Sequence, residues 1–226
     1  MVTYYKVGGY VRDEILGVKS KDIDFAVEAD SYEQMRDDII SKGMTIFQER
    51  PEFFSIRARH PKLGGVDYTL CRKDGFYSDN RHPDSVEIGT IYDDLARRDF
   101  TVNAIALSED GHIIDPHNGV DDLNLRLLRC VGNTEQRFNE DPLRILRAMR
   151  FHIVRKFILS RDIRMAFLAD ELLLQLQTVS LERVYEELKK CFEHNSWATI
   201  QFFSVYTQLQ QAIFRDMGLA LTPRIP

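Results

Sequence analysis

The chain has 226 residues, of which 44% are hydrophobic and 29% charged, and its formal net charge is −5. This composition is typical of a globular protein with one large or two smaller cores, and it excludes a disordered chain. The negative net charge argues against a protein that coats nucleic acid, and the lack of a signal peptide or of an apolar run of about 18 residues predicts a cytoplasmic protein without a membrane segment.

The first half of the chain alternates short β-like runs with helical runs, which is typical of an α/β or α+β unit. Strands are predicted at residues 4–7, 22–27, 53–59, 66–70 and 86–89. Short helices are predicted at residues 10–16 and, with Ser31 as the cap, at residues 31–41. The polar segment between Cys71 and Asp84 is predicted to be a long mobile loop.

The second half of the chain loses the β pattern after about Asn133. Apolar residues then recur at spacings of three and four, which predicts amphipathic helices to near Met217. We therefore expect an α+β head at residues 1–132 and an all-helical part at residues 133–226. The three cysteines are far apart and form no CxxC pattern, so the sequence predicts neither a disulfide framework nor a zinc site.

Two aspartates in a predicted strand form a candidate metal site. Asp22 and Asp24 are two residues apart, so the period-two geometry of a strand puts both side chains on one face. Two carboxylates with water and substrate phosphate oxygens are a ligand set that Mg²⁺ accepts. An exposed strand face with two solvated acids is the alternative, and the pair alone does not decide between them.

The segment before these aspartates resembles a cradle for phosphate. Gly8 and Gly9 let the backbone approach a phosphate closely, and a helix N-terminus with Arg12 follows at once. The alternative is a tight turn between two packed elements. A second feature favours phosphate binding, because the segment from Arg137 to Arg164 contains eight Arg or Lys residues against three acids.

Five motifs in order resemble the class II tRNA nucleotidyltransferase/poly(A) polymerase family. The motifs are Gly8-Gly9-Tyr10-Val11-Arg12-Asp13 with Leu16-Gly17 and Asp22-Ile23-Asp24; Arg97-Arg98-Asp99-Phe100-Thr101-Val102-Asn103-Ala104; Asp115-Pro116 with Gly119 and Asp121-Asp122-Leu123; Glu140-Asp141-Pro142-Leu143-Arg144 with Arg147 and Arg150; and Ser180-Leu181-Glu182-Arg183. The similarity spans about residues 4–190.

This resemblance implies a polymerase-β-like nucleotidyltransferase head with a mixed sheet, followed by a helical neck and body. It also implies that the 3′-hydroxyl of tRNA attacks the α-phosphate of CTP or ATP without a nucleic-acid template and releases pyrophosphate, so that C, C and A are added. Asp22 and Asp24 would hold Mg²⁺, with Asp67 as the candidate third carboxylate. Gly8, Gly9, Arg12, Arg98 and Asn103 would bind the nucleotide.

The fourth motif offers a way to choose bases without a template. Asp141 and Arg144 are three apart on a predicted helix, where a carboxylate and a guanidinium can imitate the Watson–Crick partner of cytosine or adenine. The competing interpretation is that Asp141 caps this helix and Pro142 lies in its first turn. Arg147 and Arg150 are predicted to point toward the triphosphate, although arginines at this spacing also occur on solvated helix faces.

Other expectations concern the loop at residues 74–83 and the helical part. The resemblance implies that this loop helps to switch from C to A addition. Only about 75 residues follow Arg150, whereas the family has longer helical regions that grip tRNA, so we expect a homodimer, recognition of the acceptor end alone, or a compact form of the enzyme. CC-only addition, A-only addition, poly(A) synthesis and a non-catalytic RNA-binding relative are the alternatives.

Overall fold

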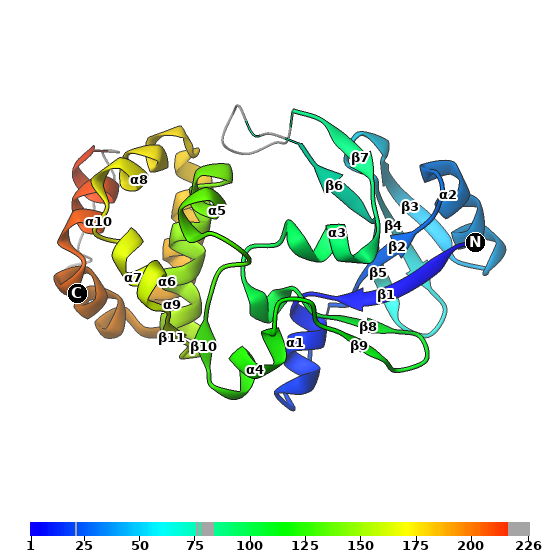
Figure 1. Ribbon diagram of the computed structural model, residues 1–226, viewed down its shortest axis with the longest axis horizontal. Helices are drawn as coiled ribbons and strands as arrows, with labels where there is room; N and C mark the ends of the chain where they lie inside the picture. The colour runs from blue at the N-terminus through cyan, green and yellow to red at the C-terminus, as the bar shows by residue number, and fades with distance from the viewer. Residues whose placement is uncertain (21, 76, 78–83, 217–226) are drawn as a thin grey trace, which may run out of the picture. The chain divides into compact units, whose positions relative to one another are not determined.

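The computed structural model describes residues 1–20, 22–75, 77 and 84–216 (Figure 1). It divides into two compact units. The N-terminal unit comprises Met1–Gly75 and Asp84–Leu125, and the chain from Arg126 onward makes up most of the C-terminal unit.

A seven-stranded mixed sheet in the order β3-β4-β5-β2-β1-β8-β9 is the centre of the N-terminal unit. Its strands are β1 (Thr3–Val7), β2 (Asp24–Glu28), β3 (Thr45–Arg50), β4 (Ser55–His60), β5 (Gly64–Leu70), β8 (Ala106–Ser108) and β9 (Ile113–Ile114). Strands β2 and β5 pair in parallel, whereas the other neighbours pair antiparallel. The predicted α+β head with a mixed sheet is confirmed.

Short elements complete this unit. They are the two-stranded sheet of β6 (Arg72–Asp74) and β7 (Val86–Ile88), the helices α1 (Gly9–Ile15), α2 (Tyr32–Ser41), α3 (Ile91–Ala96) and α4 (Gly119–Asn124), and the 3-10 turns η1 (Pro51–Phe53) and η2 (Thr101–Asn103). Strand β6 lies inside the segment that we predicted to be a loop. It was not predicted because it forms only by pairing with β7, which is distant in sequence. Strand β3 was missed because a bulge between Ile46 and Gln48 breaks its alternation.

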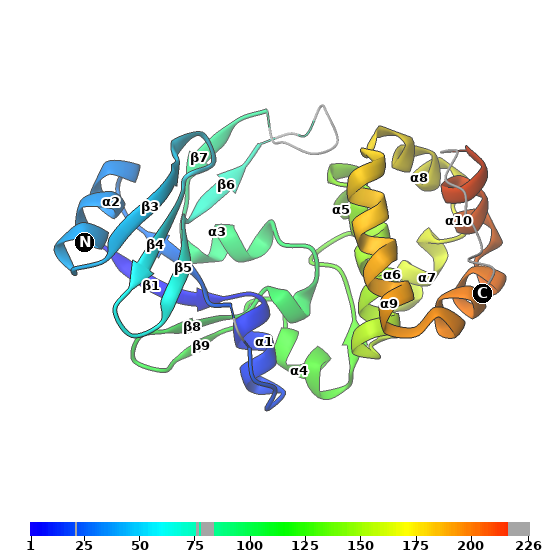
Figure 2. The ribbon, with the colours of Figure 1, turned by 180° about the vertical axis from the view of Figure 1, so that it is seen from behind.

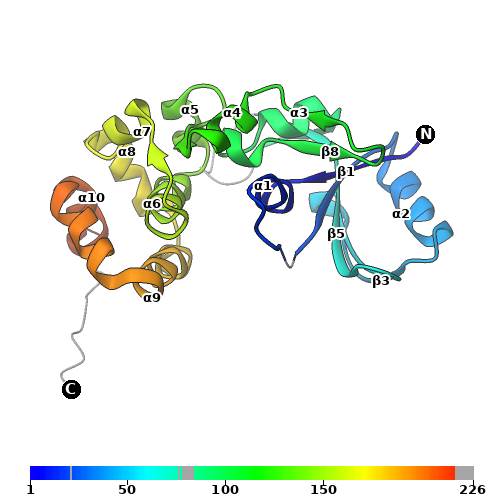
Figure 3. The same cartoon turned by 90° about the horizontal axis from the view of Figure 1, so that it is seen from below.

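The two faces of the large sheet differ in character. Helix α2 lies against one face of the sheet (Figures 2 and 3). Its Met35 and Ile39 pack there with Ile56, Val66 and Tyr68 of the sheet. Its N-terminus is capped as predicted, since the hydroxyl oxygen of Ser31 accepts a hydrogen bond from the backbone of Gln34 at 3.0 Å. Alternate residues of the same strands point to the other face, where the polar side chains gather.

The C-terminal unit is helical. It contains α5 (Thr134–Glu140), α6 (Leu143–Arg155), α7 (Arg161–Ala166), α8 (Asp170–Leu174), α9 (Leu181–Val205) and α10 (Thr207–Gln211), with a 3-10 turn at Gln175–Thr178 and a π-helical turn at Ala212–Asp216. One parallel pair of two-residue strands, β10 (Leu127–Leu128) and β11 (Ile158–Leu159), corrects the expectation of an all-helical part after residue 132.

Helices α6 and α9 lie side by side and form the core of this unit (Figure 2). Ile145 and Met149 of α6 and Val184 and Leu188 of α9 are buried, as their spacing predicts. All three cysteines of the chain are free and buried. Within the residues that the structure describes, no helix is both long enough and apolar enough to span a bilayer.

Candidate active site

One face of the large sheet carries a row of polar side chains that crosses four strands. The register pairs Asp24 of β2 with Asp67 of β5. Asp67 lies opposite Arg57 of β4, and Arg57 lies opposite Gln48 of β3. These residues line an open pocket of about 450 Å³ together with Arg50, Ser55 and Thr69. The candidate third carboxylate, Asp67, therefore lies beside Asp24 although 42 residues separate them in the chain.

Asp22 is placed differently from our prediction. Strand β2 begins at Asp24 rather than at residue 22, because β1 ends at Val7, the residue paired with Asp24, and the chain then turns at Gly8. Asp22 is exposed in the segment before the strand. The predicted strand therefore begins two residues later than expected, and a shared face for Asp22 and Asp24 stays a prediction. Asp22 is close enough to add to the negative potential at Asp24.

The charge of Asp24 is unfavourable in the protein. Desolvation in the pocket and the negative charge of Asp67 raise the pKa of Asp24 above its ordinary value, with a smaller contribution from Asp22. The guanidinium groups of Arg98 and Arg57 act in the opposite direction. A cation placed between the two carboxylates would relieve this repulsion.

The donor set fits Mg²⁺ better than a metal that needs a protein cage. Among the described residues, no three carboxylate, imidazole or thiol side chains come together as a metal-binding group. Mg²⁺ is commonly held by one or two carboxylates, and it takes its remaining ligands from water and substrate phosphates. Asp24 and Asp67 satisfy that requirement.

The glycine turn next to this pair is held against an arginine. Gly8 has φ 68° and ψ −132°, a conformation that favours glycine, and a Cβ at this position would lie 3.0 Å from Nη1 of Arg98. Nη2 of Arg98 donates to Asp94 at 2.8 Å, and Nη1 donates to the backbone oxygen of Asn103 at 3.4 Å. The position of the Arg98 guanidinium beside the turn is therefore fixed from two sides.

Asp94 is the anchor for Arg98 and for its neighbour Arg97. Burial alone would raise the pKa of the Asp94 carboxyl, which is 1% exposed, but the two guanidinium groups hold it below its ordinary value. The capping box between Thr90 and Asp93 begins α3 and presents Asp94 one turn before the two arginines. Asp94 was not predicted from the sequence. Its spacing could have indicated the role, because it precedes Arg97 by three residues and Arg98 by four, the spacings at which helical side chains pair.

Arg12 and Asn103 belong to a buried network against the same turn. Nε of Arg12 donates to Asp13 at 2.9 Å, and Nη1 donates to the side-chain oxygen of Asn103 at 2.7 Å. The Asn103 amide in turn donates to Asp99 at 3.0 Å. Arg12 and Asn103 are each 7% exposed, so the guanidinium of Arg12 is buried in this network. A buried guanidinium requires such partners.

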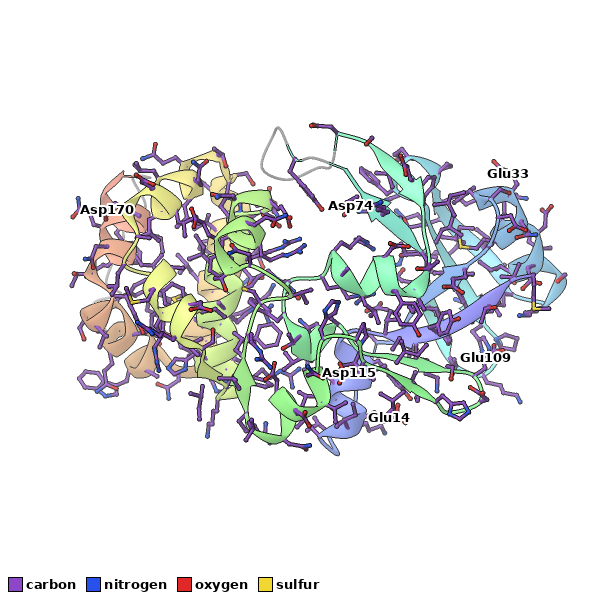
Figure 4. The ribbon with its side chains drawn as sticks, in the orientation of Figure 1. Glu14, Glu33, Asp74, Glu109, Asp115 and Asp170 are labelled. Atoms are coloured by element: carbon purple, nitrogen blue, oxygen red, sulfur yellow. The ribbon has the colours of Figure 1, made fainter. Side chains whose placement is uncertain are left out.

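Helix α4, which contains part of the third motif, packs against the turn η2 that carries Asn103. Both carboxylate oxygens of Asp115, labelled in Figure 4, accept backbone hydrogen bonds at the start of α4, from Gly119 at 2.7 Å and from Val120 at 2.9 Å. A Cβ on Gly119 would lie 2.2 Å from the backbone oxygen of Thr101. The close contact between α4 and η2 therefore depends on glycine at this position.

In the C-terminal unit, Asp141 does not lie on a helix. Helix α5 ends at Glu140 and α6 begins at Leu143, so Asp141 is in an extended conformation between them, with φ −149° and ψ 98°. The following Pro142 disfavours helical backbone at Asp141, which explains the break. Oδ1 of Asp141 accepts from the backbone of Leu143 at 3.2 Å, as the capping interpretation predicts.

The two residues expected to read the base are positioned by different partners. Nη2 of Arg183, at the start of α9, donates to Oδ2 of Asp141 at 3.1 Å. Nη1 of Arg144 donates to Glu140 at 2.9 Å and to the backbone oxygen of Arg137 at 3.0 Å. Both side chains are thereby held in place while they remain partly exposed.

Arg147 and Arg150 follow Arg144 along α6 at steps of three and are half-buried. Nε of Arg150 donates to Glu187 of α9 at 2.5 Å. Sequence reasoning missed Glu187 and the role of Arg183 as a partner of Asp141, because α6 and α9 meet only in the tertiary structure. The expected switching loop at residues 74–83 lies mostly outside the described residues, and its role stays a prediction.

Comparison with known proteins places these motifs in a family. The family described as "Poly A polymerase head domain" matches residues 4–129. The CCA-adding enzyme of Oceanobacillus iheyensis is 38% identical over 217 residues, which are 94% of this chain and 52% of that protein. The chain therefore spans about half the length of the curated relatives it matches.

Solved structures agree with this assignment. The Bacillus stearothermophilus CCA-adding enzyme in complex with CTP has a TM-score of 0.76 at 30% identity over 97% of this chain and 55% of that one. A tRNA nucleotidyltransferase complexed with a primer tRNA and an incoming ATP analog has a TM-score of 0.76 at 29% identity over 98% of this chain and 61% of that one. The matched head spans more than half of the chain and contains the first three motifs, so this chain belongs to the poly A polymerase head domain family.

Proposed function

We propose that this chain is a CCA-adding tRNA nucleotidyltransferase, which adds C, C and A from CTP and ATP to the 3′ end of tRNA without a template and releases pyrophosphate. Residues 1–132 form the nucleotidyltransferase head in this proposal, and residues 133–226 form the neck and a short body. In this proposal the enzyme acts in the cytoplasm. The relatives that carry the name CCA-adding enzyme support the reaction, and the site geometry supports its chemistry.

The pairing of Asp24 with Asp67 carries the proposal. Two carboxylates side by side on adjacent strands, one with a raised pKa, form a site for divalent cations in a pocket open to substrate. With Asp22 contributing from the segment before β2, they would hold Mg²⁺, which when bound neutralises phosphate charge and activates the attacking hydroxyl. Nucleotidyl transfer needs mainly positioning and charge neutralisation, so a side-chain base is not required.

The remaining residues of the head position the triphosphate. The backbone at Gly8 and Gly9 approaches the phosphates in this proposal. Arg98 lies against this turn, and its hydrogen bond to Asp94 holds the guanidinium there. Arg12 and Asn103 keep the turn in shape through their buried network, and in this proposal they support nucleotide binding through it. Removing these contacts would lower the affinity for both CTP and ATP.

The neck selects the base. Asp141 accepts a hydrogen bond from the amino group that cytosine and adenine share, and Arg144 donates to a ring nitrogen or carbonyl. Uracil and guanine present the opposite pattern and would leave buried groups unpaired, which is costly. Arg147 and Arg150 contribute positive charge on the same helix for the triphosphate.

Sequencing of extended 3′ ends tests this function. We expect the full chain with Mg²⁺ to convert tRNAs that end before CCA, at the first C and at the second C into tRNAs that end in CCA. Asp24→Ala is the control for contaminating activity. Failure to incorporate CTP into any of the three substrates would contradict CCA addition, and incorporation of ATP alone would instead favour an A-adding enzyme or a poly(A) polymerase.

A non-catalytic RNA-binding relative is the second candidate. It is favoured only if tRNA binds while no nucleotide is incorporated with either Mg²⁺ or Mn²⁺. The raised pKa of Asp24 argues for catalysis, because a protein that only binds RNA gains nothing from two repelling carboxylates at its surface.

Light scattering with and without tRNA would test the expected homodimer.

A further inference from the structure

The polar row on the sheet continues beyond the carboxylates, away from the glycine turn. Arg57 lies next to Asp67, and its Nε is 2.6 Å from Oδ1 of that carboxylate. Gln48 and Arg50 of the edge strand β3 follow, and the amide oxygen of Gln48 accepts from Arg50 at 2.9 Å once the amide is oriented to satisfy its hydrogen bonds. This part of the pocket therefore contains two guanidinium groups and no acid other than the catalytic pair.

An exposed aromatic ring lies beside these arginines. The bulge between Ile46 and Gln48 makes Phe47 the extra residue of β3, and its side chain is 58% exposed. The guanidinium carbon of Arg57 is 5.9 Å from the centre of the Phe47 ring. A strand that turns a phenylalanine outward next to an arginine, rather than into the core under α2, offers a flat apolar surface together with a cation.

The strand order separates this surface from the triphosphate turn. Asp24 on β2 has β1 and the Gly8 turn on one side, and β5, β4 and β3 on the other. In an in-line displacement the attacking hydroxyl and the leaving pyrophosphate lie on opposite sides of the reacting phosphorus. With the triphosphate at Gly8 and Arg98, the attacking strand approaches from the side of Arg57 and Phe47.

We propose that Phe47, Arg50 and Arg57 form the binding site for the single-stranded 3′ end of the RNA primer. Arg50 and Arg57 hold its terminal phosphodiesters, and Phe47 stacks on one of its unpaired bases. This inference rests on the proposed nucleotidyl transfer for the direction of approach. Base stacking on an aromatic side chain beside positive charges is the usual means of binding single strands without regard to sequence.

The chemistry suits a growing strand whose terminal bases change. A site that recognises phosphate and a stacking face accepts a discriminator base, a first C or a second C equally, because every base has a π-face. Arg57 also bridges the two functions, since it lies between Asp67 and the Phe47 ring and so joins the primer to the carboxylates. The three residues are positioning residues, because none of them contacts the bond that is formed.

Binding of RNA and of nucleotide, measured separately on the full chain, tests the proposal. The probes are a tRNA that ends at the first C, with a fluorescent base analogue at its 3′ end, and CTP alone in the absence of RNA. We expect Arg50→Gln, Arg57→Gln and Phe47→Ala each to weaken tRNA binding about tenfold, and the arginine variants to lower the salt dependence of binding by about one charge. The affinity for CTP should stay close to that of the wild type in Arg50→Gln and Phe47→Ala, whereas Arg57→Gln also removes the partner of Asp67 and is judged on tRNA binding alone.

Two matched controls separate this role from general effects. Arg59→Gln removes a guanidinium from the same face of β4, two residues from Arg57 and outside the pocket lining, and should leave tRNA binding unchanged. Phe47→Tyr keeps an aromatic ring and should retain the quenching of the fluorescent base that Phe47→Ala abolishes. Melting temperatures check that the variants fold.

The outcomes are distinguishable from those for the proposed function. Unchanged tRNA affinity in all three variants, loss of CTP affinity instead of tRNA affinity, or an equal effect of Arg59→Gln would overturn the primer site. None of these measurements depends on incorporation, so a catalytically inactive chain that binds tRNA through these residues would still support the site while contradicting nucleotidyl transfer.

Discussion

At the scale of single residues, charge decides what the site can hold. The pKa of Asp24 is raised by desolvation and by Asp67, so its ionised form is less stable in the folded protein than in the unfolded chain. This penalty is present at neutral pH and disappears as the pH falls through the raised pKa. The same repulsion makes the pair a good ligand for a divalent cation.

Asp24→Asn should therefore raise the melting temperature at neutral pH and abolish nucleotide incorporation. The stability gain should vanish under acidic conditions, where Asp24 of the wild type is protonated. Mg²⁺ should stabilise the wild type and have much less effect on the variant. Differential scanning fluorimetry across pH and Mg²⁺ concentration measures all three effects, and a variant that Mg²⁺ still stabilises fully would remove Asp24 from the metal site.

At the scale of elements, close packing between short segments holds the glycine turn at Gly8 and Gly9 in place. Helices α1 and α4 and the turn η2 are each too short to be stable alone, and buried polar contacts join them. The hydroxyl of Thr101 in η2 donates to the fully buried Asp122 of α4 at 2.5 Å. The network of Arg12 and Asn103 connects η2 with α1.

Gly119→Ala tests this dependence on close packing. A methyl group at Gly119 would meet the backbone of Thr101, so α4 has to move, and we expect a loss of about 2–4 kcal/mol in the free energy of unfolding. Gly65→Ala in β5 is the control, because nothing lies within 4 Å of its Cβ position. Chemical denaturation compares the two, and equal stabilities would show that α4 is not tightly packed.

Some of the helices and strands could be predicted from the sequence pattern, and others could not. The strands at residues 4–7 and 66–70 and the helix capped by Ser31 were predicted because their signals are local: alternation, periodicity and a cap. Strands β3, β6, β8 and β9 and the helices α3 and α4 were missed. Strand β3 contains a bulge, and β6 is only a strand because β7 pairs with it, which no local window shows.

At the scale of the whole molecule, the residues proposed for metal binding and those proposed for base selection belong to different compact units. Asp24 and Asp67 belong to the N-terminal unit, whereas Asp141 and Arg144 belong to the C-terminal unit. Each pair is held by partners within its own unit, such as Arg57 for Asp67 and Arg183 for Asp141. A substitution in one unit should therefore leave the local chemistry of the other intact.

Arg144→Gln should reduce incorporation of CTP and ATP about 100-fold and relax the rejection of UTP, while Mn²⁺ binding stays as in the wild type. The reason is that the guanidinium matches the base, whereas the metal needs only the carboxylates of the head. Single-nucleotide incorporation with each of the four triphosphates and electron paramagnetic resonance of Mn²⁺ measure the two properties. Loss of Mn²⁺ binding in this variant would contradict the separation.

The order and spacing of charged and glycine residues were enough to predict the α+β head, the helical region, the family and most of the candidate site. Motifs of this kind lie close together in the chain, so their chemistry can be recognised before the fold is known. The position of Asp22 outside the strand and the burial of Arg12 were decided by the tertiary structure, whereas the break at Asp141 follows from the local sequence, because Pro142 comes next. The first two depend on a partner far away in sequence or on where a neighbouring strand ends. The surface of Phe47, Arg50 and Arg57 likewise exists only because β3 joins the sheet beside β4, and pairing between strands sets which side chains share a face.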